Sequence, residues 1–213
     1  MSVKTILCYG DSNTWGYEPV TATRYPHQTV WTGVAQAALG TEFELLNEGL
    51  NARTTVYDDP WSDGKNGKAY LEVCLTTHKP LDLVVLMLGT NDLKFTDAAG
   101  AAKGAETLVK LIRLLSHKED SSPIFKADAQ ILLVSPIRLG ADVINRPTTL
   151  RRGYEQSLRF GELYADVARA RNVHFLDAAL HASPSDRDCI HMKPESHRAL
   201  GLAIAKKVRD ILR

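Results

Sequence analysis

Short apolar runs alternate with longer amphipathic segments along the whole chain. Five of these runs have the length of β-strands and end at turn residues, and they predict strands at Val3–Tyr9, Phe43–Asn47, Leu81–Leu88, Gln130–Val134 and Val173–Leu176. The run 81–88 is apolar at almost every position, which is typical of a parallel strand covered on both faces. We therefore expect a buried parallel sheet.

Segments with apolar residues at helical spacing fill the gaps between the strands. They predict helices at Thr29–Leu39, Lys68–His78, Ala98–His117, Gly153–Arg171 and Pro194–Leu212. The alternation of strands and helices implies right-handed crossovers, with helices on both faces of the sheet. We expect an α/β protein in which residues 1–213 form one domain and residues 137–152 form the longest irregular loop.

Composition and charge exclude several classes of protein. Lysine and arginine number 26 against 25 acidic residues, so nucleic-acid binding has no electrostatic basis. No apolar stretch reaches the length of about 18 residues that a membrane helix needs, and the first residues do not resemble a signal peptide. Cys8, Cys74 and Cys189 are an odd number without a C-x-x-C motif, which argues against disulfides and zinc. We expect a cytoplasmic protein without membrane, nucleic-acid, metal or cofactor binding.

Polar side chains follow the carboxyl ends of the predicted strands, the edge at which such folds bind ligands. The segments concerned are Gly10–Gly16, Glu48–Thr55, Gly89–Asp92 and Asp186–His191. In a parallel sheet these segments meet at the same edge. The sequence therefore predicts one crevice that contains a hydroxyl, an amide, a carboxylate and an imidazole.

Cleavage of an ester by a serine enzyme needs this set of groups. The hydroxyl of Ser12 is a poor nucleophile until a base takes its proton, and His191 is the candidate base. A carboxylate must fix the imidazole tautomer, and Asp188 is closer to His191 in sequence than its competitor Asp186. The tetrahedral intermediate needs N–H donors, which Asn91 and the Ser12 backbone can supply.

These segments resemble the sequence blocks of the SGNH (GDSL-like) serine hydrolases. The blocks are Gly10-Asp11-Ser12, Gly89-Thr90-Asn91-Asp92 and Asp188-x-x-His191, in the family's order and over almost the whole chain. The sequence is most similar to the bacterial arylesterase and acyltransferase subgroup, with T-W-G at 14–16 and E-G-L-x-A-R-T-T at 48–55. The resemblance implies a three-layer α/β/α, flavodoxin-like fold around a five-stranded parallel sheet.

The resemblance also implies a role for each site residue. Ser12 is the expected nucleophile, His191 the base and Asp188 the residue that orients it. The expected oxyanion hole combines the Ser12 N–H, a backbone N–H of the second block and the Asn91 side chain.

Two positions depart from the family pattern. Asn13 stands where the motif has leucine, and we expect this change to alter packing behind the turn rather than the chemistry. Ala52 stands where the second-block donor is usually glycine, and its N–H remains the expected donor if φ is negative, with Gly49 as the alternative.

Several other polar residues near the strand ends have alternative interpretations. Asp11 is expected to bond backbone amides of its turn, and Asp92 is expected to cap a helix. Trp15 is either core or a wall of the acyl pocket, Thr90 is a candidate substrate contact, and Arg53 either forms a salt bridge or arranges the second block. The other histidines are expected to be exposed or partly buried, namely His27, His78, His117, His174, His181 and His197. His191, His197 and Asp186 are alternative candidates for metal ligands, but their spacing in the sequence is unsuitable for a metal site.

The resemblance implies a serine esterase that hydrolyses short, acetyl-type esters of aryl or alkyl alcohols through an acyl-enzyme, with acyl transfer to alcohols as a further activity. A carbohydrate O-acetyl esterase is the alternative, and a flavin-binding protein is the alternative from another class. The resemblance also implies a homo-oligomer. Leu139, Val143 and Ile144 lie outside any regular pattern, so we expect them to pack against their own chain, as a lid over the site, or against a partner subunit.

Overall fold

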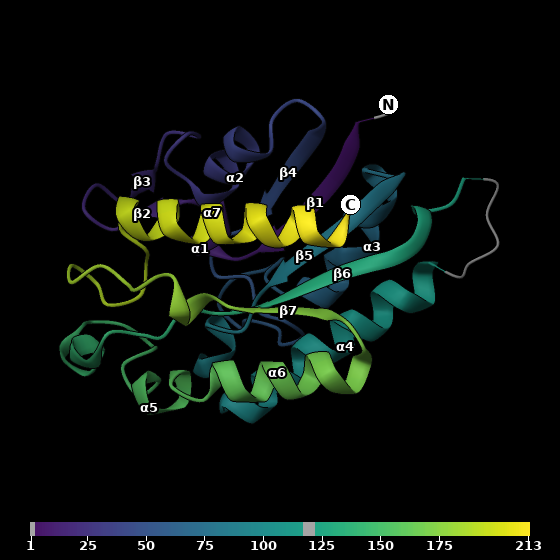
Figure 1. The fold of residues 1–213 in the computed structure, drawn as a ribbon. Helices are drawn as coiled ribbons and strands as arrows, with labels where there is room; N and C mark the ends of the chain where they lie inside the picture. Colours follow the sequence, from purple (N-terminus) through teal and green to yellow (C-terminus); the bar gives the residue numbers. More distant parts are fainter. Residues whose placement is uncertain (1–2, 117–121) are drawn as a thin grey trace.

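A fully parallel, five-stranded sheet lies at the centre of the protein (Figure 1). The structure is a computed structural model and describes residues 3–116 and 122–213. In spatial order the strands are β4 (Phe43–Gly49), β1 (Lys4–Gly10), β5 (Leu81–Met87), β6 (Phe125–Ser135) and β7 (His174–Asp177). The chain order reverses between β1 and β5, and the carboxyl ends of strands at such a switch point form a ligand-binding crevice.

Five longer helices cover the two faces of the sheet, which confirms the expected three-layer sandwich (Figure 1). Helices α2 (Trp31–Leu39) and α7 (Pro194–Ile211) pack on one face. Helices α3 (Gly67–Thr77), α4 (Ala98–Ser116) and α6 (Phe160–Arg171) pack on the other. The predicted end of α4, His117, lies outside the described residues.

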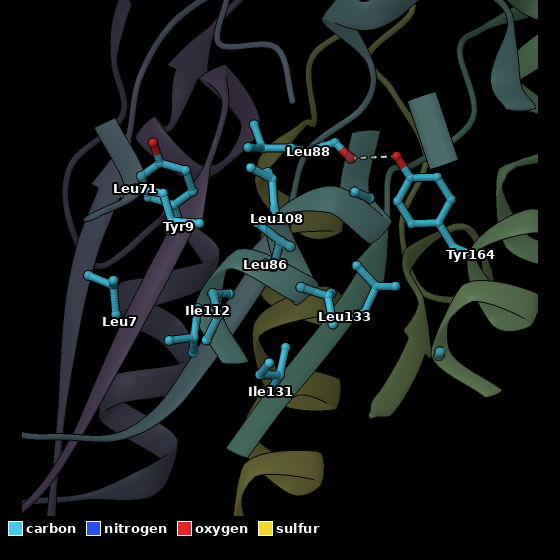
Figure 2. Close-up of a cluster of buried hydrophobic side chains, with 14 of the residues drawn as sticks. Leu7, Tyr9, Leu71, Leu86, Leu88, Leu108, Ile112, Ile131, Leu133 and Tyr164 are labelled. Carbon is cyan, nitrogen blue, oxygen red and sulfur yellow. Dashed lines mark hydrogen bonds between the residues drawn. The ribbon is translucent and has the colours of Figure 1, made fainter. Parts of the chain in front are cut away.

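Side chains of the strands alternate between the two helical layers, as the pleat requires. In β1, Leu7 and Tyr9 face the layer of α3, α4 and α6, while Ile6 and Cys8 face α2 and α7. Figure 2 shows the first of these clusters, in which the hydroxyl of Tyr164 donates a hydrogen bond of 2.7 Å to the carbonyl of Leu88. Both clusters consist of buried apolar side chains from the strands and the helices, so burial of apolar surface holds the layers together.

One ion cluster joins α4 to α6 at the margin of this packing. Glu106 Oε2 lies 2.5 Å from Lys103 Nζ, and Glu106 Oε1 lies 3.1 Å from Lys110 Nζ and 2.7 Å from Arg171 Nε. The hydrogen bond from Lys103, with those from Arg171 and Lys110, lowers the pKa of Glu106 to about 2, although burial opposes the shift. The carboxylate is therefore ionised over the whole physiological pH range.

The sequence prediction was wrong for one helix and one strand boundary. The segment 153–171 forms two helices, α5 (Tyr154–Ser157) and α6, because the Ser157 hydroxyl donates to the Tyr154 carbonyl and accepts the Leu139 N–H. Such local bonds compete with helix continuation. Strand β6 begins at the buried Phe125 rather than at Gln130, because the exposed residues 126–128 interrupt the apolar pattern after Phe125.

Several short helices, strands and turns lie at the edge of the sheet where the strands end. They are α1 (Ser12–Trp15), the hairpin β2 (Tyr17–Glu18) and β3 (Thr23–Arg24), and the 3₁₀ turns η1 (Asn91–Lys94), η2 (Ala141–Asn145) and η3 (Ala178–Leu180). Within the long loop, Leu139 and Val143 are buried against their own chain, while Ile144 is 63% exposed. Among the helices of the described residues, none is long and apolar enough to cross a membrane.

Candidate active site

Ser12 begins the short helix α1 directly after β1. The Asp11 side chain caps this helix by accepting the Asn13 N–H at 2.9 Å, as expected, and Gly16 ends it in the left-handed conformation, with φ of 95°. Gly49 allows α1 to lie against the end of β4, because a Cβ at this glycine would lie 2.1 Å from the backbone nitrogen of Trp15. The turn therefore holds Ser12 at the crevice predicted by the topology.

A chain of hydrogen bonds connects Ser12, His191 and Asp188. The Ser12 Oγ lies 2.8 Å from His191 Nε2, and His191 Nδ1 lies 2.5 Å from Asp188 Oδ2. The other oxygen of Asp188 accepts the N–H groups of Ile190 and His191, both at 3.0 Å. Asp186 is exposed, and the carboxylate that contacts the imidazole is that of Asp188.

The surroundings of Asp188 favour its charged form. Burial acts to raise the pKa of Asp188, but the hydrogen bond and charge of His191, together with the N–H groups of His191 and Ile190, hold that pKa below its usual value. An ionised Asp188 keeps the proton of the neutral imidazole on Nδ1, so that Nε2 can accept the proton of Ser12.

Among the described residues, the first and second sequence blocks each contain a backbone N–H group that is free. Within the described residues, the N–H groups of Ser12 and Ala52 have no hydrogen-bond acceptor. The N–H of Gly49, by contrast, donates to Asn47 Oδ1 at 3.0 Å, which favours Ala52 over Gly49 as the second-block donor. The negative φ expected for Ala52 is wrong, because φ is 66° and the residue lies in the left-handed region, where glycine has the lower conformational cost.

The second and third sequence blocks are held together behind these donors. Asn91 Nδ2 donates to the Arg53 carbonyl at 3.2 Å. The buried Arg53 guanidinium donates to the carbonyls of Gly10, at 3.0 Å, and of Glu48, and lies 4.1 Å from the ring centre of Tyr9. Arg53 therefore arranges the ends of β1 and β4 through their backbones.

Three further polar residues of the motifs, Asp11, Thr90 and Asp92, are buried. The expectation that Asp92 caps a helix is wrong. Its carboxylate instead accepts the N–H of Thr55 at 3.0 Å and also the Thr55 hydroxyl. Burial raises the pKa of Asp92 and of Asp11 to about 6 in each case. Thr90 is 3% exposed and forms a side-chain hydrogen bond to Asp11, so a substrate contact at Thr90 stays a prediction.

Two residues that contact the His191 segment were not identified from the sequence. Asn13 Oδ1 accepts the Met192 N–H at 2.9 Å, and Asn13 Nδ2 donates to the Ile190 carbonyl at 3.3 Å, so its amide holds the backbone on both sides of His191. The ring of Tyr17 lies 4.3 Å from the imidazole centre at an angle of 37°. The only signal for Asn13 was its departure from the leucine of the motif, and Tyr17 carried no signal.

Trp15 belongs to neither core cluster. Its ring is half-buried and lies 5.2 Å from the guanidinium carbon of Arg24, whose Nε donates to the Trp15 carbonyl at 2.7 Å. A substrate contact of Trp15 therefore stays a prediction.

One of the remaining histidines departs from expectation. His197 is completely buried and accepts the Trp31 N–H at 3.3 Å, and burial lowers its pKa to about 4. His27 and His181 are exposed and His78 and His174 partly buried, while His117 lies outside the described residues. The described part of the chain contains no cluster of three histidine, cysteine or acidic side chains able to hold a metal ion, and Cys8, Cys74 and Cys189 are free thiols.

The chain is similar to a known protein family and to solved structures over almost its whole length. Residues 8–199 match the model of the GDSL-like lipase/acylhydrolase family. The M. smegmatis aryl esterase is 37% identical, with a TM-score of 0.89 over 99% of this chain and 100% of that one. A carbohydrate acetylesterase family member from Sinorhizobium meliloti is 38% identical, with a TM-score of 0.89 over 99% of each chain. No curated protein sequence is similar enough to match. The chain belongs to the GDSL-like lipase/acylhydrolase family, whose members are also called SGNH hydrolases.

Proposed function

We propose that this protein is a serine esterase that cleaves short, acetyl-type carboxylic esters. The observation that carries the proposal is the continuous relay from the Ser12 hydroxyl through His191 to Asp188, with distances of 2.8 and 2.5 Å. A flavin-binding function on the same fold would leave this relay without a purpose.

The relay supports a two-step reaction. Ser12 Oγ attacks the acyl carbonyl while His191 Nε2 takes its proton, and Asp188 stabilises the imidazolium that forms. His191 then gives this proton to the leaving alcohol, and an acyl-enzyme remains on Ser12. Water activated by His191 releases the acid and restores the hydroxyl.

The negative charge of the tetrahedral intermediate needs hydrogen-bond donors. The free N–H groups of Ser12 and Ala52 and the side-chain amide of Asn91 are the proposed donors. Loss of a single donor of this kind costs about 3–4 kcal/mol of transition-state stabilisation in other serine enzymes. The Asn91 amide has two N–H groups, so it can keep its bond to the Arg53 carbonyl while donating to the oxyanion.

The comparisons support esters of aryl or alkyl alcohols as substrates, since one similar structure is described as an aryl esterase. The alternative, a carbohydrate O-acetyl esterase, is supported by the similar structure described as a carbohydrate acetylesterase family member. Alcohols that replace water in the second step would give acyl transfer.

Hydrolysis of p-nitrophenyl acetate tests this proposal. We expect Ser12→Ala to fold normally and to lose nearly all activity, because the hydroxyl and the acyl-enzyme disappear together. Ser183→Ala, which removes the hydroxyl of an exposed serine outside the relay, is the matched control. A Ser12→Ala variant that keeps a tenth of the wild-type kcat would exclude Ser12 as the nucleophile.

Assembly and location belong to the same proposal. The exposed side chain of Ile144 supports a contact between subunits. Leu139 and Val143 do not, because both are buried against residues of their own chain. Three free thiols support a reducing, cytoplasmic compartment. Light scattering at micromolar concentration tests assembly, and a particle of 23.5 kDa would exclude the oligomer.

A further inference from the structure

A large, positively charged groove lies beside the loops of the active site. Its volume is about 940 Å³, and its walls come from residues 59–62, from the end of η1 and from residues 146–152. Four cationic side chains line it, namely Lys94, Arg146, Arg151 and Arg152, against one acidic side chain, Asp59. The whole chain carries a net charge of only +1, so this is a local concentration of positive charge.

Two of these cations are available to a ligand. Lys94 Nζ lies 3.8 Å from Asp59, and Arg146 lies 2.6 Å from Asp142. Arg151 and Arg152 are exposed, and neither forms an ion pair with another described residue. A guanidinium group presents paired N–H donors that match the two oxygens of a carboxylate. The free charges of the groove therefore fit an anion, and its volume of about 940 Å³ has room for one larger than a simple ion.

The groove also presents aromatic surface to solvent. Trp61 is 85% exposed, which is unusual for so large a side chain. Phe95, which also lines the groove, stacks on Tyr57 with a centroid distance of 6.4 Å. An exposed indole next to hydrogen-bonding groups suits a ligand with one apolar and one polar side, such as a sugar ring.

Two links join the groove to the active site, one through η1 and one through Arg146. Lys94 lies in η1, which begins with the proposed oxyanion donor Asn91. Arg146 Nη2 donates to the Asp186 carbonyl at 2.9 Å and so touches the segment that carries His191. Burial lowers the pKa of Lys94, while the charges of Asp59 and of Asp11, the neighbour of Ser12, act to raise it. A ligand in the groove can therefore extend from the reacting ester.

We propose that this groove binds the alcohol portion of the ester and that this alcohol is a carboxylate-bearing carbohydrate. The inference rests on the proposed esterase function and narrows its substrate class. An acetyl group is far smaller than the groove, so the larger part of the substrate is the part that occupies it. The carboxylates pair with Arg151 and Arg152, and a sugar face covers Trp61.

Two acetylated oligosaccharides that differ in charge test the inference. Acetate release is measured from O-acetylated oligogalacturonides and from O-acetylated xylo-oligosaccharides of the same length. We expect a kcat/KM at least about tenfold higher for the acidic substrate, and this ratio should fall as salt rises from 0.05 to 0.5 M, because exposed charges are screened. The double variant R151Q/R152Q should lower the ratio about tenfold, mainly through KM.

A matched control separates the groove from the overall charge of the protein. R169Q/R198Q removes two exposed arginines from α6 and α7 and should preserve the wild-type ratio. Equal kcat/KM values for the two saccharides, or an equal loss in both double variants, would overturn the inference. If p-nitrophenyl acetate hydrolysis still depends on Ser12 in that case, the esterase proposal stands. If it does not depend on Ser12, the esterase proposal itself fails.

Discussion

Replacement of Asn13 by leucine, the residue of the family motif, should damage catalysis although Asn13 touches neither the Ser12 hydroxyl nor the imidazole. The side chain is 4% exposed, and its amide binds the backbone of Met192 and Ile190 on the two sides of His191. Leucine has nearly the same volume but cannot make either bond. Asn13→Leu therefore removes the support of the His191 segment without opening a cavity.

The structure sets the size of the expected effect. Loss of the 2.9 Å bond leaves the buried Met192 N–H without an acceptor, which costs about 1–3 kcal/mol, and the 3.3 Å bond to Ile190 adds less. We expect the free energy of unfolding to fall by about 2 kcal/mol. A shift of His191 by about 1 Å would lower kcat by roughly 10²-fold, while KM changes little because the buried Asn13 does not face the substrate.

Urea unfolding and the kinetics of p-nitrophenyl acetate hydrolysis measure both quantities. Asn13→Asp keeps an acceptor for Met192 but loses the donor to Ile190, so its kcat should lie between those of the wild type and Asn13→Leu. Asn145→Leu, at an exposed position, is the control. An Asn13→Leu protein with wild-type kcat would refute the assignment of Asn13 as a positioning residue, and so would a loss confined to KM.

Four further substitutions test the relay, the ion cluster and the conformation of the second sequence block. Asp188→Asn should lower kcat roughly 10³–10⁴-fold, because the imidazole tautomer is no longer fixed, whereas the exposed Asp186→Asn should leave kcat within about twofold; the opposite pattern would exchange their roles. Glu106→Gln should lower the free energy of unfolding by about 2 kcal/mol at pH 7, because the low folded-state pKa contributes stability above the unfolded value. In urea titrations this difference should shrink as the pH falls from 4.5 towards 2, and a constant difference would contradict it. Ala52→Gly should raise the midpoint of urea unfolding by relieving about 1 kcal/mol of left-handed strain, and a lower midpoint would contradict that strain.

The fold was predictable because the hydrophobic pattern of each segment indicates the same element that the alternating strand–helix topology requires. The apolar run at 81–88 could only be a strand covered on both faces, and the alternation with helices left one arrangement of layers. Ser12, Asn91, Asp188 and His191 could be placed together because they follow strand ends that meet at one edge. That inference needed no side-chain contacts.

The remaining features depend on contacts between residues distant in sequence. The amide of Asn13 meets backbone groups near residue 191, and Asp92 meets Thr55 rather than the helix beside it. His197 is buried because α7 turns that face towards Trp31. The break before α6 follows from a bond between Ser157 and Leu139. No local pattern encodes these pairings, because each requires the folded geometry of two segments.

The identity of the nucleophile is tested most directly by a p-nitrophenyl phosphonate ester, which reacts as the substrate does but leaves a stable product. Attack by Ser12 Oγ forms an oxygen–phosphorus bond and expels p-nitrophenolate, with the proton passing to His191. We predict release of one p-nitrophenolate per chain, complete loss of esterase activity, and an adduct that peptide mass spectrometry places on Ser12. Inactivation with Ser12 unmodified, or with the adduct on another residue, would contradict the account.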